Sequence, residues 1–487
     1  MTEVEPGTPE LSNAPDRPEA LKSLFDYPFM SALQERRTRR VAQGVSIDAG
    51  ALSHQSMNKP LRLTPLEEAI LIVITGITGM TTHDGPLRRP DGGPELGTPF
   101  LHAMGRSASS ADNCQPTSFF MINDDGIFLI KRPEPREMAA ILRNLPPRWN
   151  DWSESDWLSV AEAVKVKIYN RRLEFPRKFP YYLGWNKQHS NVPGTTIFFP
   201  VVDLTRQAIN VYLILLSEPD GQRPFAIDDW RPFKPKGIVE WLAWAGQAVG
   251  LTEKIPYQPV GGLSRIRSGW SNREQPAPLG YAQTMRTDQE TFLLMQNLML
   301  TGHSMGLGGW IHASVFPPYV LQRDPAKDWY GIGFRFQEPE KRRFFRHLPP
   351  VPSTQPNPVG IDGILEGLCP PYIRSMDDAV EQVLEEKYGA AGAYGDKEIF
   401  ARSYKGMGNA EEFLRNASHH PKEAIEYTKV ICRYIHETYG RFPAHTDAFH
   451  VPGTWVQFSH VEMEYYENFY DPSLYRRQAQ HAGEWGH

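Results

Sequence analysis

The feature that most constrains this chain is the stretch DQETFLLMQNLMLTGHSM at residues 288–305. Its apolar side chains occur at helical spacing on most faces of the helix, so most of the helix surface must be buried. Such a helix lies either in the centre of a large domain or in a subunit interface. We therefore predict a homodimer, with burial by large insertions of the same chain as the alternative.

The charge balance argues against several classes of partner. The chain has 487 residues with 52 Lys and Arg against 57 Asp and Glu, which gives a net charge of −5. This balance provides no overall basic field to hold nucleic acid or anionic lipid, so neither is expected as a partner. The 12 Trp, 20 Tyr and 24 Phe are typical of a folded protein rather than a disordered one.

Cysteine content and apolar runs favour a cytoplasmic protein that does not span a membrane. The three cysteines form no disulfide framework and no CxxC pair, which is typical of a reducing compartment. The acidic, proline-rich N-terminus is unlike a signal peptide, and residues 1–20 are expected to be a disordered tail. The longest apolar run, at 69–77, is far shorter than the roughly 20 residues that a spanning helix needs.

The pattern of elements predicts an α+β fold without regular βαβ alternation. Thr64 and Glu67 have capping-box spacing and mark the start of a helix, and SFFMINDDGIFLIKR predicts a β-hairpin at 118–132. Further helices are expected at about 28–40, 153–173, 237–251 and 420–439. Two strands are expected within 195–216, single strands at 328–337 and 454–466, and a Gly/Pro-rich loop at 81–105.

The common nucleotide and hydrolase motifs are absent, since no GxxxxGK[ST], strand-linked GxGxxG, HExxH or GxSxG pattern occurs. Three other segments carry polar chemistry, and the first is the run Arg36, Arg37, Thr38, Arg39 and Arg40. Guanidinium groups match phosphate oxygens bidentately, so the run can act as a phosphate clamp. Taken alone, it is more typical of a solvated helix end.

The other two segments are a polar loop and a glycine-rich turn. The loop at 106–117 clusters hydroxyl and amide side chains immediately before a strand, at Ser109, Ser110, Asn113 and Gln115. Such groups suit a flat ring with donors and acceptors along its edge, although polar turns before strands are ordinary. The segment 295–309 closes a hydrophobic helix with Gly306, Leu307 and Gly308, which is also a common helix C-cap.

Taken in this order, the three segments resemble the FMN-dependent nitroreductase family. Members carry R-R-S-x-R at the end of a first helix, a (P)SS-x-N-x-Q-P loop leading into a strand, and later Q-N-L-x-L-A-A-x-x-L-G-L-G. The matching residues here are 36–40, 109–116, 296–300 and 306–308. The resemblance implies a central, mainly antiparallel sheet flanked by helices, and a homodimer with the flavin between its subunits.

The resemblance also implies the cofactor contacts. The phosphate and ribityl chain of FMN would be held by Arg36, Arg37, Thr38 and Arg40. The flavin ring or ribityl hydroxyls would be contacted by Ser109, Ser110, Asn113 and Gln115. A backbone N–H at about Ala313 or Ser314 would donate to ring N5. A late arginine would complete the phosphate site, with Arg343 taken from the candidates Arg342, Arg343 and Arg346.

The activity implied is that of an FMN-dependent oxidoreductase acting on a specialised small molecule, with NAD(P)H as the reductant. One alternative is a dehydrogenase or oxidase of a specialised metabolite that uses O₂, and another is a flavin-free relative that serves as a binding module. The family domain would occupy residues 21–350 with an insertion at about 124–290, and residues 351–487 would form a C-terminal extension. No side-chain acid or base is obligatory, because the flavin performs the redox step.

A last group of polar residues lies near the C-terminus, at His445, Asp447, His450, His460, Glu462 and Glu464. On one strand, His460, Glu462 and Glu464 would share a face, and together with His445 and Asp447 they could form an N/O metal site. The favoured interpretation is a set of histidines capped by neighbouring carboxylates in a polar interface, with no metal.

Overall fold

A computed structural model gives the fold of the chain. It describes residues 18–76, 79–80, 100–102, 104–110, 113–132, 135–184, 186–230, 259–280, 283–337, 357–395, 407–444 and 446–486, and seven residues between 238 and 250. Most of the predicted N-terminal tail and of the predicted loop at 81–105 lie outside the described residues.

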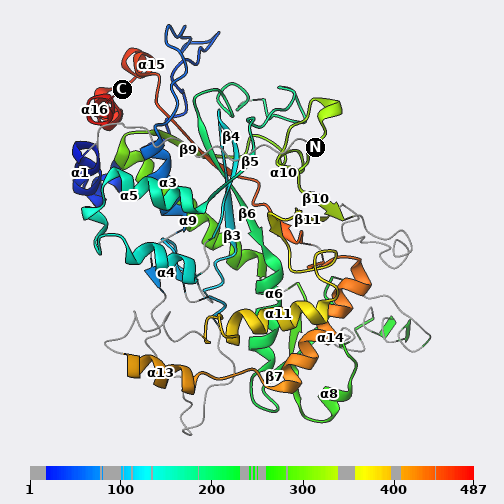
Figure 1. Cartoon of the computed structure of the whole chain (residues 1–487). Coiled ribbons are helices and arrows are strands. Elements are labelled where there is room, and N and C mark those ends of the chain that lie inside the picture. Colours follow the sequence, from blue (N-terminus) through cyan, green and yellow to red (C-terminus); the bar gives the residue numbers. More distant parts are fainter. Residues whose placement is uncertain are drawn as a thin grey trace, which may run out of the picture.

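An antiparallel sheet flanked by helices forms the centre of the described structure (Figure 1). Its strand order is β5-β4-β3-β6-β14-β9, and β13 also pairs with β6. Every pairing in this sheet is antiparallel. The strands are β3 (Thr117–Asn123), β4 (Gly126–Ile130), β5 (Lys165–Tyr169), β6 (Thr196–Asp203), β9 (Gly308–His312), β13 (Phe449–His450) and β14 (Trp455–Ser459). The expected antiparallel sheet is therefore confirmed at this level.

The predicted hairpin is confirmed by β3 and β4, whose register pairs Asn123 with Gly126. Gly126 has a φ of 142°, and a Cβ at this position would lie 1.9 Å from the Tyr169 carbonyl oxygen. The turn therefore requires glycine, because β5 passes too close for any side chain.

Helices α3 (Pro65–Gly76), α5 (Glu154–Val164) and α9 (Gln283–Met305) cover one face of the sheet. Their apolar side chains pack against alternate strand residues such as Phe119, Phe198 and Phe458. Both α3 and α5 begin at capping boxes, where Thr64 pairs with Glu67 and Ser153 with Asp156. The predicted helix starts are confirmed there, and α3 lies between α5 and α9 in this layer.

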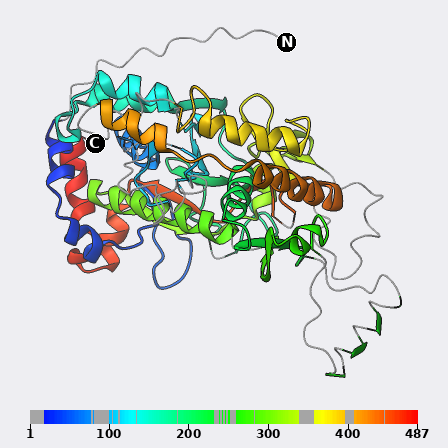
Figure 2. The ribbon, with the colours of Figure 1, turned by 90° about the horizontal axis from the view of Figure 1, so that it is seen from below.

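The opposite face of the sheet is covered by segments with little helix. Phe120, Phe199 and Trp455 point to this side and pack against residues of the segments 173–182 and 315–336. A separate helical core lies beyond one end of the sheet, where α6 (Leu204–Leu216) packs on α11 (Met376–Tyr388) and α14 (Lys422–Tyr439) (Figures 1 and 2). The described part of the chain thus has two large cores on the sheet and one beside it.

The C-terminal residues are built into the central layer. Strand β14 lies between β6 and β9, so residues beyond 450 complete the sheet begun by the first half of the chain. Helix α16 (Arg476–Trp485) packs on α1 (Pro18–Asp26) and on α9, and Trp485 is fully buried in the core under α3. Figure 2 shows α1 and α16 side by side at one edge of the molecule.

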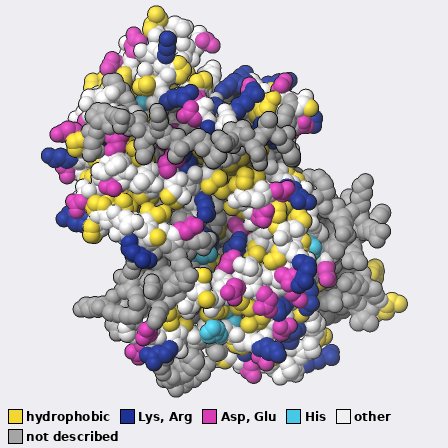
Figure 3. All heavy atoms as spheres, viewed as in Figure 1, with side chains coloured by type: hydrophobic (Ala, Val, Ile, Leu, Met, Phe, Trp, Pro, Cys, Tyr) yellow, Lys and Arg dark blue, Asp and Glu magenta, His cyan; other side chains and the backbone are white. Residues whose placement is uncertain are grey.

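The remaining elements are short or peripheral. They are α2 (Phe29–Glu35), β1 (Gly79–Met80), β2 (Met104–Gly105), α4 (Pro135–Arg143), β7 (Arg223–Ile227), α8 (Ser264–Arg267), β8 (Ser271–Pro278), α10 (Pro317–Leu321), β10 (Arg335–Gln337), β11 (Asn357–Ile361), β12 (Leu365–Glu366), α13 (Met407–Asn416) and α15 (Met463–Phe469). Among the described residues, no helix combines the length and apolarity needed to cross a bilayer. Basic and acidic side chains are interspersed on the face shown in Figure 3.

Several predicted elements are wrong in type. The second strand expected within 195–216 is helix α6, whose start is capped by Asp203 accepting from the Thr205 N–H. Because α6 is buried on nearly all sides, its sequence shows no polar stripe and reads like a buried strand. The segment 454–466 is strand β14 followed by helix α15, so the strand ends at Ser459.

Other predicted elements are wrong in extent. The helix expected at 153–173 ends at Val164, where the alternating sequence KVKIY enters β5. Helix α2 ends at Glu35, before the arginine run. Only Arg335–Gln337 of the strand expected at 328–337 forms. The helix expected to be buried at 237–251 falls largely outside the described residues, and its described side chains Ile238, Trp241, Leu242 and Val249 are exposed.

Candidate functional site

The run at 36–40 is held by its backbone and exposes most of its side chains. The Arg39 N–H donates to the carbonyl of Gly309 in β9 at 3.4 Å, and the Arg40 N–H donates to the Tyr466 hydroxyl at 3.0 Å. Arg37, Thr38 and Arg40 are exposed and Arg36 is half-buried. Helix α15 and strand β9 therefore fix the position of the run without using these four side chains.

Arg37 and Arg39 differ from their neighbours in the run. The Arg37 guanidinium donates to the carbonyls of Gln34 and Arg36, at 2.7 and 2.9 Å, so it caps the end of α2. Arg39 is 5% exposed, with its guanidinium 6.0 Å from the Tyr466 ring centroid. Its Nη2 is buried and has no hydrogen-bond partner among the described residues. Arg39 therefore retains an unused donor beside the exposed members of the run.

A layer of neutral rings lies close to Arg40. The rings of Trp310 and His312 stack with centroids 3.4 Å apart, and Trp455 Nε1 donates to His312 Nε2 at 2.7 Å. With Nε2 accepting, the Nδ1–H of a neutral His312 donates to Ser314 Oγ. Burial lowers the pKa of His312 far below its usual value, and burial followed by the Arg40 charge lowers the pKa of His189 to about 4. This layer is uncharged at neutral pH.

The chain after β9 places the predicted N5 contact next to this layer. Ala313 is exposed and Ser314 is buried. The Ser314 carbonyl accepts from the Leu183 N–H at 2.7 Å, and the Ala313 carbonyl accepts from Asn186 Nδ2 at 3.4 Å. Residues 313–314 are thus fixed by a loop from the opposite face of the sheet, and the hydroxyl of Ser314 is engaged by His312.

The loop at 106–117 is anchored to α3, β3 and α9. The guanidinium of Arg106 donates to the carbonyls of Thr75 and Thr117, at 3.0 and 2.7 Å, and burial lowers its pKa to about 10. Asn297 of α9 donates to the Ser107 carbonyl at 2.8 Å. The Q-N-L segment of α9 and the serine-rich loop, far apart in sequence, therefore lie against each other.

Within the loop, most of the predicted ligands are engaged with neighbouring residues. Asn113 and Gln115 are buried with φ of 45° and 46°, and Gln115 Nε2 donates to Asn113 Oδ1 at 2.7 Å. Ser110 Oγ accepts from the Cys114 N–H at 3.1 Å, whereas Ser109 is exposed. Gln115 Oε1 is buried and has no partner among the described residues. The loop therefore offers one exposed hydroxyl and one unused acceptor.

Glu290 of α9 is a member of this cluster that the sequence did not indicate. It is 3% exposed and lies 3.7 Å from Cys114 Sγ. Burial raises the pKa of the Glu290 carboxyl, while hydrogen bonds from Ser110 and Cys114 and the Arg106 charge act in the opposite direction. Nothing in its surrounding helical pattern distinguishes Glu290 from an exposed glutamate.

The glycines between α9 and β9 are required by the close approach of other parts of the backbone. Gly306 has a φ of 99°, and a Cβ there would lie 2.9 Å from the Arg477 carbonyl oxygen. A Cβ on Gly308 would lie 2.9 Å from the Arg39 carbonyl oxygen. The turn therefore needs small residues so that α16 and the arginine run can approach it.

The two groups of predicted ligands lie near different parts of α9. Ser110 contacts Glu290, while burial and the nearby Arg39 charge lower the pKa of His303 to about 4. A helix rises 1.5 Å per residue, so these two positions are roughly 20 Å apart along its axis. Within a single chain, the arginine run and the serine loop do not converge on one point.

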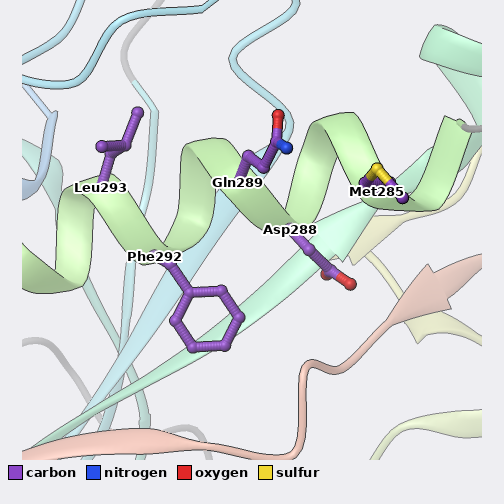
Figure 4. Close-up of a pocket in the computed structure, with 5 residues that line it drawn as sticks. All are labelled: Met285, Asp288, Gln289, Phe292 and Leu293. Atoms are coloured by element: carbon purple, nitrogen blue, oxygen red, sulfur yellow. The ribbon is translucent and has the colours of Figure 1, made fainter.

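An exposed apolar surface covers the outer face of α9 near its start (Figure 4). It lines a pocket of about 750 Å³ formed by Met285, Asp288, Gln289, Phe292 and Leu293. Met285 is 63% exposed, Phe292 42% and Leu293 47%. Asp288 pairs with His450 at 3.1 Å. The helix expected to be buried on most sides thus has three exposed apolar side chains near its start.

The described members of the polar group near the C-terminus, for which an N/O metal site was the less favoured interpretation, do not assemble as one group. Its members pair elsewhere: His450 with Asp288, Asp447 with Arg441, and His460 with Glu67. The reason is that β14 ends at Ser459, so His460 and the glutamates after it do not share a strand face. His445 and Arg343, like Arg342 and Arg346, lie outside the described residues.

Two groups of residues in the described structure have the donor atoms of a metal site. One is Glu67, His460 and His481, all buried, and the other is His54, Glu462 and Glu464. Sequence reasoning found Glu67 only as a helix cap and did not single out His481, because the partners come from three distant segments.

No protein-family model matches the chain, and no curated protein matches it.

Proposed function

We propose that this protein is an FMN-dependent oxidoreductase with a nitroreductase-like fold, acting on a specialised small molecule. The observation that carries the proposal is that each of the three motif segments contacts or forms part of the unit made by α9 and β9. Arg39 is bonded to Gly309, Ser107 to Asn297, and the glycine turn joins the helix to the strand. Segments separated by more than a hundred residues in sequence thus border one structural unit.

The residues present fit the two ends of FMN. Beside Arg36, Thr38 and Arg40, which have accessible side chains, Arg39 Nη2 is a buried donor without a partner among the described residues. A phosphate supplies acceptors for such donors. At the loop, Gln115 Oε1 is a buried acceptor without a partner among the described residues, which suits a ring N–H. Ser109 adds an exposed hydroxyl.

The separation of these groups favours a homodimer as part of the proposal. Ser110 of the loop, at Glu290, and the run, near His303, lie roughly 20 Å apart along α9, so one flavin is best held by the run of one subunit and the Ser109–Ser110 part of the loop of the other. Two copies of α9 packed antiparallel across a two-fold axis would bring unlike ends together. The exposed Met285, Phe292 and Leu293 would be covered in the same contact.

Bound flavin would supply the two-electron redox chemistry, and the protein would supply placement and access. The neutral rings of His189, Trp310 and His312 would form a water-poor wall near Arg40. The exposed arginines would favour negative charge on the cofactor. This division of labour needs no side-chain nucleophile, general acid or general base.

The absorption spectrum of the purified protein tests the proposal. We expect the two-banded visible spectrum of oxidised flavin, or its appearance when FMN is added to protein freed of cofactor, at one FMN per chain. Protein that stays colourless and does not bind added FMN would reject the proposal and leave the binding-module alternative.

The direction of electron flow needs a separate experiment. Anaerobic mixing of the flavin-loaded protein with NADH or NADPH should bleach the visible bands if the protein is a reductase. Bands that persist with both nucleotides but bleach with an organic substrate, and return on admission of O₂, would identify the dehydrogenase or oxidase alternative.

A further inference from the structure

Three buried side chains from distant parts of the chain meet behind the arginine run. Glu67 lies in the first turn of α3, His460 follows β14, and His481 lies in α16. Their exposed fractions are 0%, 4% and 5%. Glu67 Oε1 is 3.1 Å from His460 Nε2 and 2.9 Å from His481 Nε2. One carboxylate oxygen therefore faces two imidazole nitrogens.

The hydrogen bonds of His481 determine what its Nε2 can do. His481 Nδ1 lies 2.8 Å from the Met305 carbonyl oxygen, which can only accept. Nδ1 must therefore carry the proton, and Nε2 of the neutral ring presents a lone pair. That lone pair points at a carboxylate oxygen, which is also an acceptor. A stable arrangement requires a cation between the two atoms, which is either a metal ion or a proton held by a charged imidazolium or a neutral carboxyl group.

The other carboxylate oxygen is already used in the helix cap. Glu67 Oε2 accepts from the Thr64 N–H at 2.6 Å and from the Thr64 hydroxyl at 2.9 Å. Oε2 also lies 3.3 Å from His460 Nε2, and Oε1 is the oxygen nearest to both histidines. The three candidate donor atoms all lie within 4.8 Å of one another. Tetrahedral Zn²⁺ with bonds of about 2.0–2.1 Å places its ligand atoms about 3.3 Å apart, which is close to the 3.1 and 2.9 Å between Glu67 Oε1 and the two Nε2 atoms.

We propose that Glu67, His460 and His481 bind a divalent cation, Zn²⁺, through one carboxylate oxygen and two Nε2 atoms. The His₂Glu donor set is one that Zn²⁺ uses, and a water would complete the tetrahedron. The bond from His481 Nδ1 to a backbone carbonyl is the usual outer contact of a metal-binding histidine, which fixes the ring and its tautomer. The proposal does not depend on flavin binding.

The neighbouring group His54, Glu462 and Glu464 lacks these features and provides an internal control. Both oxygens of Glu462 are occupied by protein donors, including the Gly44 N–H at 2.8 Å and Asn58 Nδ2 at 2.6 Å. His54 Nε2 is 3.9 Å away and Glu464 is exposed. This carboxylate therefore serves as an acceptor for the 44–58 loop.

The proposed ion would join α3, the end of β14 and α16. Helix α16 reaches this position through close packing on Gly306, where His481 Cβ would lie 2.9 Å from an added Cβ. An ion with ligands from all three elements would fix α16 against α9, in the same region where β9 supports the arginine run. We assign it a structural role, because all three ligands are buried.

Zinc titration of chelator-treated protein tests the site. We expect one Zn²⁺ per chain by calorimetry, a rise in thermal midpoint on adding ZnCl₂, and tetrahedral visible bands when CoCl₂ replaces it. His481→Ala and, independently, Glu67→Gln should weaken Zn²⁺ binding at least about a hundredfold, whereas His54→Ala should not.

The titration also separates the metal from a shared proton. Wild-type protein that binds neither Zn²⁺ nor Co²⁺ would overturn the proposal and assign a proton shared between His481 Nε2 and Glu67 Oε1. Binding that survives unchanged in both His481→Ala and His460→Gln would also overturn it. Circular dichroism identifies any variant that fails to fold, in which case the cobalt spectrum of the wild type decides alone.

Discussion

The two parts of α9 that border the motif segments use polar residues in opposite ways. Near Glu290, the loop residues Asn113 and Gln115 are buried and bonded within the loop, so they maintain its shape. Near His303, the arginine run is fixed by backbone bonds, and Thr38 and Arg40 remain exposed. Polar motifs that look equally functional in sequence thus divide into groups that maintain the fold and groups that are available to a ligand.

The largest expected effect concerns the outer face of α9, which joins the two ends in the proposed dimer. Phe292→Asp combined with Leu293→Asp should convert the dimer to a monomer, because burying a large apolar side chain contributes roughly 1.5–3 kcal/mol and a charge reverses this. Sedimentation velocity measures the change. Leu263→Asp, at a residue also 47% exposed but just before α8, is the matched control and should leave the dimer intact. A wild-type monomer would refute the dimer itself.

A substitution in the serine loop should lower the free energy of unfolding more than a substitution in the arginine run. Arg106→Met removes a charged donor from the carbonyls of Thr75 and Thr117, so we expect a loss of about 3 kcal/mol in the free energy of unfolding. Arg40→Met, in the exposed run, should change it by less than about 0.5 kcal/mol. Urea unfolding measures both. Equal losses would contradict the claim that the serine loop maintains the fold and the arginine run does not.

Substitutions in the arginine run should weaken FMN binding. Arg36→Ala and Arg40→Ala should each weaken FMN binding about tenfold to a hundredfold, since a charge-assisted phosphate contact contributes about 1.5–3 kcal/mol. Fluorescence titration with FMN measures the affinity. Arg171→Ala, an exposed arginine far along the chain, is the control. If FMN titrates identically into the two run variants and wild type, the phosphate assignment fails.

The smallest expected effect is a pH dependence of the free energy of unfolding that arises from His189, near Arg40 of the run. The folded-state pKa of His189 is about 4, below its ordinary value of 6.5. The unfolded chain therefore takes up this proton first, so the stability contribution is complete above pH 6.5 and declines as the pH falls from 6.5 toward 4. His189→Asn should flatten the urea midpoint across this window. If the urea midpoint of His189→Asn changes with pH as it does in the wild type, groups other than His189 determine the pH dependence of stability.

The sequence predicted elements whose signals are local. The turn Asp124-Asp125-Gly126, the capping box at Thr64 and the long apolar run of α9 each depend on near neighbours, and each is confirmed. Helix α6 was missed because burial on all sides removes the polar stripe that marks a helix. The central place of β14 was missed because strand order is set by pairing partners far along the chain.

The candidate site shows the same division. The arginine run and the serine loop were found from their composition. Their anchoring partners, such as Glu290, and the pairing of Glu67 with His481 depend on tertiary contacts that no short pattern encodes. The sequence also could not show that Asn113 and Gln115 are engaged with each other, because that depends on their left-handed backbone conformations.

Mixed dimers test most directly the claim that the two ends of α9, from two subunits, hold one flavin. The run variant Arg36→Ala/Arg40→Ala and the loop variant Ser109→Asp, differently tagged, should each bind FMN poorly as homodimers. A purified heterodimer of the two contains one site with an intact run and an intact loop, and we expect it to bind one FMN per dimer with wild-type affinity. A heterodimer that binds no better than either parent would contradict the account.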